Sequence, residues 1–388
     1  MNESTFSPGG GQPGSAARGQ APSGLSAVGS VAVQTFAAHQ SIMTTAQQSQ
    51  SMDGQHVNAM AGDQRGTDPA LADYDDLPDG HFYDPDAEYE PDPEYAATLA
   101  PDAARQRRER IGPTGRPLPY FPIPGPLTNH GPAKIIAMCN QKGGVGKTTS
   151  TINLGAALAE YGRRVLLVDF DPQGALSVGL GVNPMELDLT VYNLLMERGM
   201  SADEVLLKTA VPNMDLLPSN IDLSAAEVQL VSEVARESTL QRALRPLLSD
   251  YDYIVIDCQP SLGLLTVNAL TAAHKVIVPL ECEFFALRGV ALLTETIEKV
   301  QERLNPDLQL DGILATMYDS RTVHSREVLA RVVEAFDDHV YHTVIGRTVR
   351  FPETTVAGEP ITTYASNSVG AAAYRQLARE VLARCPAE

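Results

Sequence analysis

Residues 140–149 read Asn140-Gln141-Lys142-Gly143-Gly144-Val145-Gly146-Lys147-Thr148-Thr149 and follow a short apolar run at residues 135–139. A segment whose pattern predicts a helix, Thr148–Tyr161, begins at the end of this stretch. Glycines allow backbone N–H groups to turn toward a phosphate, and the N-terminus of a helix adds the positive end of its dipole. The order of strand, glycine-rich loop and helix therefore predicts a phosphate-binding loop rather than a chance glycine-rich turn.

Individual side chains of this loop suit a nucleotide and a metal ion. We expect the Lys147 ammonium to reach the β- and γ-phosphates and the Thr148 hydroxyl to coordinate Mg²⁺. The usual pattern begins with a glycine where this chain has Gln141, and the loop carries an additional lysine, Lys142. The residues expected to bind the nucleotide are Lys142, Gly143, Gly144, Val145, Gly146, Lys147, Thr148 and Thr149.

Acidic residues follow two further apolar runs. One run ends in Val168-Asp169-Phe170-Asp171, and the other ends in Ile254-Val255-Ile256-Asp257. The carboxyl ends of parallel strands meet in the crevice where ligands bind, so these carboxylates are expected beside the phosphate loop. We expect Asp257 to hold Mg²⁺ through water. Asp169 and Asp171 lie two residues apart on an extended segment, so both are candidates to reach the metal or an attacking water.

From residue 134 onward, short apolar runs alternate with amphipathic segments. The runs are dense in Ile, Val and Leu with little polar alternation, which is typical of strands covered on both faces. The pattern predicts an α/β fold: a single P-loop NTPase domain with a mostly parallel, doubly wound sheet and helices on both faces. The expected strands are Ile135–Cys139, Val165–Phe170, Met214–Leu217, Tyr253–Asp257, Val276–Leu280, Gly312–Met317 and Tyr341–Ile345. The expected helices are Thr148–Tyr161, Ala225–Leu248, Leu264–Ala273, Leu287–Leu304, Ser325–Phe336 and Gly370–Ala383.

Residues 1–133 differ from the rest of the chain in composition. Gly, Ser, Gln, Ala and Pro dominate residues 1–60, residues 73–94 hold ten Asp or Glu without Lys or Arg, and a proline-rich stretch follows. Such segments bury too little apolar surface to offset their chain entropy. We therefore expect a disordered extension over 1–133, acting as a linker or as a docking arm, and a folded domain over 134–388.

The chain is acidic, with 29 Lys and Arg against 48 Asp and Glu and a formal net charge of −19. This balance excludes a generally basic DNA coat, so any contact with nucleic acid must come from a local patch. The four cysteines form no Cys-x-x-Cys pair, which argues against zinc and iron–sulfur sites and favours the reduced, buried thiols of a cytosolic protein. No apolar run approaches the ~20 residues of a membrane span, and the N-terminus lacks the pattern of a signal peptide.

Several motifs together resemble the ParA/Soj family of partitioning ATPases, within the deviant Walker A group that also includes MinD. The motifs are Lys142-Gly143-Gly144-Val145-Gly146-Lys147-Thr148-Thr149, Asp169-Phe170-Asp171-Pro172-Gln173-Gly174, Ile256-Asp257-Cys258-Gln259-Pro260-Ser261-Leu262-Gly263, Thr316-Met317-Tyr318-Asp319-Ser320-Arg321-Thr322 and Arg347-Thr348-Val349-Arg350. The resemblance runs from about Lys134 to the C-terminus. It implies a Mg²⁺-dependent ATPase with slow intrinsic turnover, with ATP and Mg²⁺ as cofactors and a cytoplasmic, nucleoid-associated location.

The resemblance also implies roles for particular residues. In this family ATP closes a homodimer, and the additional lysine, here Lys142, reaches the phosphates held by the other subunit. Together with Lys147 it belongs to the expected catalytic set, in which Asp171 positions the hydrolytic water. The ATP dimer binds DNA without sequence preference, and Arg321 and Arg350 match the arginines that the family uses for this contact. A ParB-like protein stimulates hydrolysis and releases the dimer.

Some positions depart from the family's usual pattern. Gln259 replaces a frequent proline, Ala175 replaces a common asparagine, and residues 346–355 differ from the usual sequence. Two functions therefore stay open: chromosome partitioning, or a paralogue that positions another cargo or regulates cell division or replication initiation. A membrane-bound, MinD-like protein is disfavoured because no basic amphipathic segment follows the last expected helix. The remaining alternatives are a metabolic P-loop enzyme and a non-catalytic binding module.

Overall fold

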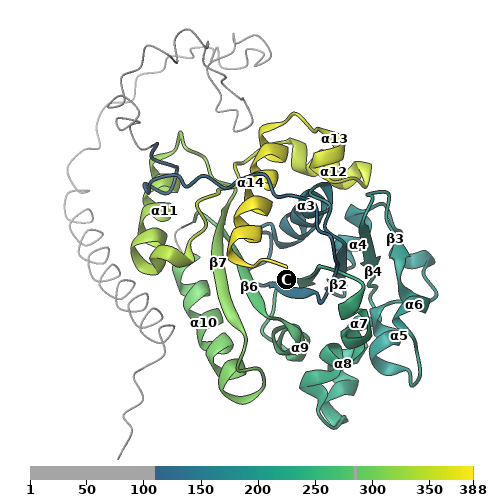
Figure 1. The fold of residues 1–388 in the computed structure, drawn as a ribbon. Helices are drawn as coiled ribbons and strands as arrows, with labels where there is room; N and C mark the ends of the chain where they lie inside the picture. The colour runs from purple at the N-terminus through teal and green to yellow at the C-terminus, as the bar shows by residue number, and fades with distance from the viewer. Residues whose placement is uncertain (1–109, 284–285, 388) are drawn as a thin grey trace, which may run out of the picture.

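The computed structural model describes residues 110–283 and 286–387, so most of the expected N-terminal extension lies outside the described residues (Figure 1). Within the described ranges, a seven-stranded sheet has the strand order β3-β4-β2-β5-β1-β6-β7. Neighbouring strands are parallel except β3 and β4, which pair antiparallel at one edge. The strands are β1 (Lys134–Met138), β2 (Val165–Phe170), β3 (Leu207–Lys208), β4 (Met214–Leu217), β5 (Tyr253–Cys258), β6 (Lys275–Glu281) and β7 (Gln309–Thr316).

Helices cover both faces of this sheet, which confirms the expected doubly wound P-loop NTPase fold (Figure 1). The helices are α3 (Lys147–Glu160), α4 (Ala175–Gly179), α5 (Val191–Met196), α6 (Ala202–Val205), α7 (Leu223–Gln229), α8 (Thr239–Leu244), α9 (Leu264–Ala272), α10 (Ala286–Arg303), α11 (Val323–Phe336), α12 (Arg350–Ala357), α13 (Ile361–Tyr364) and α14 (Val369–Arg384). Helices α3 and α14 pack side by side on one face, and α5 to α11 cover the other. None of the helices in the described ranges is both long and apolar enough to cross a membrane.

Strand β1 shows how the sequence builds a separate core on each face. Successive strand residues point to opposite faces. Ile135 and Ala137 accordingly lie in the core beneath α8, α9 and α10, whereas Ile136 and Met138 lie in the core beneath α3 and α14. Both cores are needed to cover a parallel sheet, which explains the apolar runs without polar alternation.

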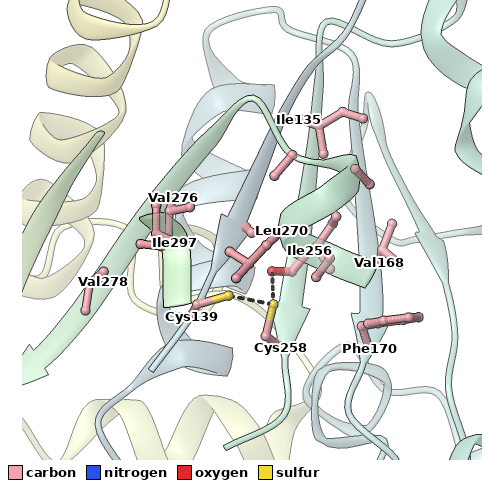
Figure 2. Close-up of a cluster of buried hydrophobic side chains, with 14 of the residues drawn as sticks. Ile135, Cys139, Val168, Phe170, Ile256, Cys258, Leu270, Val276, Val278 and Ile297 are labelled. Atoms are coloured by element: carbon pink, nitrogen blue, oxygen red, sulfur yellow. Dashed lines mark hydrogen bonds between the residues drawn. The ribbon is translucent and has the colours of Figure 1, made fainter. Parts of the chain in front are cut away.

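A pair of thiols marks the end of β1 and β5 inside the first of these cores (Figure 2). The Sγ atoms of Cys139 and Cys258 are 3.0 Å apart, and both side chains are buried. Burial and the neighbouring thiol raise the pKa of Cys258 well above its usual value. The expectation of reduced, buried cysteines agrees with this packing, and the pair joins the strand before the phosphate loop to the strand that ends near Asp257.

The segment Tyr341–Ile345 does not form the expected strand, although it runs beside β7. Val340 makes an isolated parallel bridge to Ile313 of β7, and the amides of Tyr341 and Ile345 donate to the carbonyls of Ile313 and Ala315 at 3.0 and 2.8 Å. The amides of His342 and Thr343 instead donate to the buried Glu380 carboxylate, at 2.8 and 2.9 Å. Because the Glu380 side chain accepts from amides that lie between the two contacts with β7, the ladder is interrupted and no continuous strand forms.

The expected helix Ala225–Leu248 is also corrected, because the structure divides it into α7, α8 and short 3-10 turns. Ala235 adopts a left-handed conformation with φ of 53°, which interrupts the helix. The buried Asn268 side chain on α9 stabilises the break. Its amide donates to the Arg236 carbonyl at 2.9 Å and its oxygen accepts from the Leu240 amide at 3.2 Å.

Residues 110–133 contact the domain after α11 and at the end of the sheet where β1 and β5 begin. The Arg116 guanidinium donates to the carbonyls of Asp337 and Val340 at 2.8 and 2.6 Å. The ring of His130 lies 2.8 Å from the Asp252 carboxylate, just before β5. The proposed division of the chain at residue 133 stays a prediction, since these contacts concern only the last part of the extension.

Candidate nucleotide-binding site

The loop between β1 and α3 has the backbone that a phosphate site needs. Gly144 and Gly146 have φ of 75° and 84°, a left-handed conformation that glycine adopts without steric cost. Gly146 is also the N-cap of α3, so the positive end of that helix dipole faces the loop. The Val145 carbonyl accepts from the Thr316 hydroxyl at 2.9 Å, which fixes the loop to the end of β7. The loop is therefore a held cradle of backbone amides rather than a mobile turn.

Lys147 lies inside this cradle. Its side chain is buried, and Nζ donates to the Lys142 carbonyl at 3.1 Å, so the ammonium curls over the loop from which it comes. A buried ammonium with one carbonyl partner has further donors to offer. The position suits the contact with β- and γ-phosphates that the sequence predicted.

Thr148 and Asp257 form the candidate magnesium position. The Thr148 hydroxyl donates to Asp257 Oδ2 at 2.6 Å, and Asp257 is fully buried at the end of β5. Burial, together with the charge of Asp169, raises the pKa of Asp257 to about 8. Hydroxyl and carboxylate oxygens are ligands that Mg²⁺ prefers, and a divalent cation would stabilise the charged form of this carboxylate. No group of three or more His, Cys, Asp or Glu side chains in the described residues forms a ready-made metal site, so water and phosphate oxygens would complete the coordination.

Asp169 is placed differently from its neighbours. It is the register partner of Asp257 on β2 and is fully buried. Its Oδ2 accepts from the Ser177 amide at 2.8 Å and from the Ser177 hydroxyl at 2.7 Å, which anchors α4. Burial raises the pKa of Asp169 to about 7, although the bonds from Ser177 lower it. Asp169 thus lies beside the predicted metal position with one oxygen bound to Ser177 and the other accepting from the Asp171 amide at 3.4 Å.

Asp171 lies at the mouth of the site, just beyond the end of β2. It is partly exposed, and its Oδ1 accepts from the Gln173 amide at 3.0 Å. This bond closes a turn that leads into Gly174, whose φ is 62°. The geometry leaves the second carboxylate oxygen of Asp171 as a candidate acceptor for a water near the γ-phosphate.

A cavity of about 340 Å³ opens beside the start of α3. It is lined by Gly146 and Thr149 of the loop, and Tyr374 of α14 forms part of its wall. Residues 345–355 supply most of the remaining lining, including Phe351 and Pro352. An apolar cavity that continues from a phosphate loop suits a nucleotide base. The segment that departs from the family's usual sequence therefore lines the candidate base pocket.

The predicted DNA-binding arginines lie on two segments that meet. A bridge pairs Tyr318 with Gly346, which places the turn before α11 beside the start of α12. The Arg321 guanidinium binds the Asp319 carboxylate through two contacts of 3.0 Å, and this pairing lowers the pKa of Asp319 to about 2. Arg350 donates to Glu353 at 3.1 Å. Both side chains are exposed, so each arginine can exchange its carboxylate partner for a phosphate.

Sequence reasoning missed four residues that contact the predicted site. Ser177 binds Asp169, Glu281 and Glu283 bind Lys142 at the rim of the loop, and Arg347 binds Glu281. The two glutamates follow an apolar run that ends at residue 280, the same signal that identified Asp169 and Asp257. Ser177 carries no such signal, and Arg347 stands in one of the family motifs without an assigned role, because only the folded chain brings these two residues to the site.

Comparisons with known proteins place the chain in a family. The family model described as "AAA domain" matches residues 133–310. An uncharacterized protein of Mycobacterium tuberculosis is 69% identical over 274 residues, which cover 71% of this chain and 86% of that protein. The sporulation initiation inhibitor protein Soj of Bacillus subtilis is 49% identical, over 64% of this chain and 98% of Soj. The chromosome partitioning protein ParA of Caulobacter vibrioides is 47% identical, over 65% of this chain and 95% of ParA.

Solved structures agree with this relationship. A crystal structure described as cobyrinic acid a,c-diamide synthase of Mycobacterium smegmatis, with a bound ATP analog and magnesium, is 47% identical. It aligns with a TM-score of 0.58 and covers 65% of this chain and 95% of that chain. The septum site-determining protein MinD of Pyrococcus horikoshii, complexed with Mg-ADP, is 28% identical with a TM-score of 0.52, over 64% of this chain and 96% of MinD.

Fold, loop and comparisons together define a P-loop ATPase whose cofactors are ATP and Mg²⁺. Within that class, the chain belongs to the ParA/Soj family of ATPases.

Proposed function

We propose that the protein is an ATP-driven switch in chromosome partitioning: it dimerises with ATP, binds DNA without sequence preference and is released when a ParB-like partner stimulates hydrolysis. The ParA/Soj relationship supports the general class. The proposal adds the roles of the site residues, dimerisation, DNA binding and a cytoplasmic, nucleoid-associated location. It also assigns ATPase function to residues 134–388 and treats residues 1–133 as an extension.

The observation that carries the proposal is the placement of two lysines on one loop. Lys147 is buried in the cradle, whereas the Lys142 side chain is 46% exposed at the rim. One cation is therefore positioned for the phosphates of its own subunit. The other can reach phosphates that a second copy presents across an interface, as the family resemblance implies.

Exposed valines close to the loop support an interface with a second copy. Val228, Val231 and Val234 are exposed although large apolar residues usually avoid water, and Val234 is 90% exposed. The preceding Glu227 accepts from Gln259 at 3.3 Å, which connects this surface to the loop after β5. That loop in turn adjoins the phosphate loop, because Pro260 lies next to Gly143. Apolar surface bordering the nucleotide site suits a dimer that closes over ATP.

Light scattering with Mg²⁺ and ATP tests dimerisation. We expect ATP to convert monomers into dimers and Val234→Asp to weaken the dimer at least tenfold, because a buried carboxylate would lack a partner. Val356→Asp provides a matched control, because Val356 is 91% exposed on α12, away from the proposed interface. A wild-type protein that stays monomeric at micromolar concentration with ATP contradicts the proposal.

A second function, that of a paralogue with another cargo, is favoured by one observation. The altered residues 346–355 line the candidate base pocket and carry Arg350, a predicted DNA contact. Imaging of labelled replication origins after deletion of the gene separates the two functions. Chromosome partitioning predicts misplaced origins and cells without DNA, whereas a paralogue predicts normal origin positions.

A further inference from the structure

The rim of the phosphate loop carries a chain of alternating charges. Lys142 Nζ lies 3.0 Å from Glu281 Oε2 and also contacts the Glu283 carboxylate. On its other side, Glu281 Oε1 lies 3.4 Å from the Arg347 guanidinium. The loop after β1, the end of β6 and the segment before α12 meet at these four residues, whose formal charges balance.

The backbone fixes the base of Lys142 beside these carboxylates. The Asn140 side chain accepts from the Lys142 amide at 2.9 Å and donates to the Pro279 carbonyl on β6 at 2.7 Å. The loop is thus tied to the strand that carries Glu281. Only the Lys142 side chain, and not the loop, has to move when the ammonium leaves Glu281 and Glu283.

Glu281 and Glu283 bind the Lys142 ammonium, but weakly enough for it to dissociate from them. Partial burial lowers the pKa of Lys142, but its bonds to Glu283 and Glu281 outweigh this and raise the pKa above its usual value. The Lys142 and Glu283 side chains are 46% and 55% exposed, so their ion pair contributes little to stability, whereas the Glu281 side chain is 14% exposed and its ion pair is less screened by water. A triphosphate carries more negative charge than one carboxylate, so it can compete for the ammonium.

Glu281 also connects the two cavities beside the loop. Lys142 and Glu281 line a cavity of about 430 Å³ on the side of α10, together with Arg288. Arg347 lines the candidate base pocket on the other side. Arg347 and Lys142 both bind the Glu281 carboxylate. A nucleotide that contacts Arg347 therefore changes how strongly Glu281 binds Lys142.

We infer that Glu281 and Glu283 form an acidic clamp that holds Lys142 within its own subunit before dimerisation, and that Arg347 links this clamp to the nucleotide pocket. The inference rests on the proposed cross-subunit role of Lys142. Both glutamates are positioning residues: they touch Lys142 and not the reacting phosphate. The clamp makes dimerisation harder, because Lys142 must leave two carboxylates before it reaches the second subunit.

The first test measures dimerisation of Glu281→Gln with Glu283→Gln in the full-length chain. Loss of one exposed and one partly buried ion pair should tighten the ATP dimer about three- to tenfold, while the affinity of the monomer for ATP stays within about twofold. The control is Glu302→Gln with Glu334→Gln, which removes the same charge from exposed positions on α10 and α11. The control should leave the dimer dissociation constant unchanged.

The second test measures Lys142 directly in the nucleotide-free protein. Acetylation by an amine-reactive ester is followed by mass spectrometry, with Lys208 on β3 as the internal reference. Only the neutral form of an amine is acetylated. Removal of both glutamates should lower the pKa of Lys142 and so increase its neutral fraction, which should speed acetylation of Lys142 about two- to fivefold. Arg347→Gln should have the opposite effect, because Glu281 would then be left to Lys142 alone.

The outcomes separate the clamp from the proposed function. If the wild-type protein dimerises with ATP but the double glutamine variant dimerises no more tightly than the control, the clamp is wrong. Unchanged acetylation of Lys142 in that variant overturns it as well. If the wild-type protein does not dimerise with ATP, the proposed function fails, while the acetylation rates still decide whether the clamp exists.

Discussion

Lys142 and Lys147 extend from the same loop to different surroundings. The Lys147 ammonium is buried and donates to the Lys142 carbonyl at 3.1 Å, whereas the Lys142 ammonium lies at the rim, 3.0 Å from Glu281. One loop thus supplies an inner cation for the nucleotide and an outer cation for an interface. Removing the two lysines should therefore impair different steps.

Lys147→Ala should weaken nucleotide binding severely. Loss of a buried cation that pairs with phosphate costs about 2–5 kcal/mol, or roughly a thirtyfold to several-thousandfold rise in Kd. Equilibrium dialysis with ATP measures the effect. Lys208→Ala removes an exposed lysine from β3 and should leave the affinity unchanged. Wild-type affinity in Lys147→Ala would mean that the phosphate loop has been misplaced.

Asp171→Ala should bind ATP and dimerise but hydrolyse ATP slowly. Loss of the residue proposed to position the attacking water should lower the stimulated rate about 100-fold or more. Phosphate release in a single turnover measures this rate, with the exposed Asp188→Ala as the control. Should Asp171→Ala turn over like the wild type, Asp171 would have a structural role and Asp169 would become the candidate.

Stability should fall with rising pH when nucleotide and Mg²⁺ are absent. The pKa of Asp257 is raised to about 8 and that of Asp169 to about 7, mainly by burial, so the folded state binds more protons than the unfolded state between about pH 4 and 8. The free energy of unfolding then decreases as pH rises through this window. We expect Tm in EDTA to be about 5 °C lower at pH 8 than at pH 6.

Two comparisons attribute this pH dependence to the buried carboxylates. Asp257→Asn removes one titrating group and should flatten the dependence of Tm on pH. Mg²⁺ with ATP should stabilise the protein more at pH 8 than at pH 6, because the cation favours the ionised carboxylate. Equal stabilisation at both pH values, with an unchanged slope in Asp257→Asn, would contradict the magnesium position.

Arg321→Ala combined with Arg350→Ala should remove ATP-dependent DNA binding and spare ATP binding and dimerisation. The chain is acidic, so binding depends on a few local phosphate contacts, each worth about one unit in the slope of log K against log salt. Arg198→Ala with Arg303→Ala is the charge-matched control at other exposed positions. The arginine cluster at residues 105–110 is the alternative source of positive charge for DNA binding. If deletion of 1–133 abolishes binding and the double substitution does not, the extension is the DNA contact.

The sequence pattern predicted most of the fold because burial and periodicity agree there. Helices α3, α9, α10, α11 and α14 begin and end within a residue or two of their predicted bounds. The wrongly predicted elements lie where hydrogen bonds from a single distant side chain determine the backbone conformation. Glu380 accepts from the amides of His342 and Thr343, and Asn268 stabilises the break within Ala225–Leu248. Such long-range bonds leave no trace in a local pattern.

Part of the candidate site could likewise be predicted from the sequence, and part could not. The glycine-rich loop and the aspartates at strand ends are local signals, so Lys147, Thr148 and Asp257 could be named from sequence. The burial of Asp169 against Ser177 could not be predicted from the sequence, because it depends on where α4 packs. The competition of Arg347 and Lys142 for Glu281 could not be predicted either. These two residues lie 205 positions apart in the chain, and only the fold brings both to Glu281.

The central claim is that Lys142 acts across a dimer interface, and sedimentation velocity with Mg²⁺ and ATP tests it most directly. The measurement compares Asp171→Ala, in which hydrolysis should be too slow to dissolve the dimer, with Asp171→Ala combined with Lys142→Ala. The account predicts dimers in the first variant and monomers in the second, with nucleotide affinities of the monomers within about threefold of each other. Dimers of equal strength in both variants would contradict it.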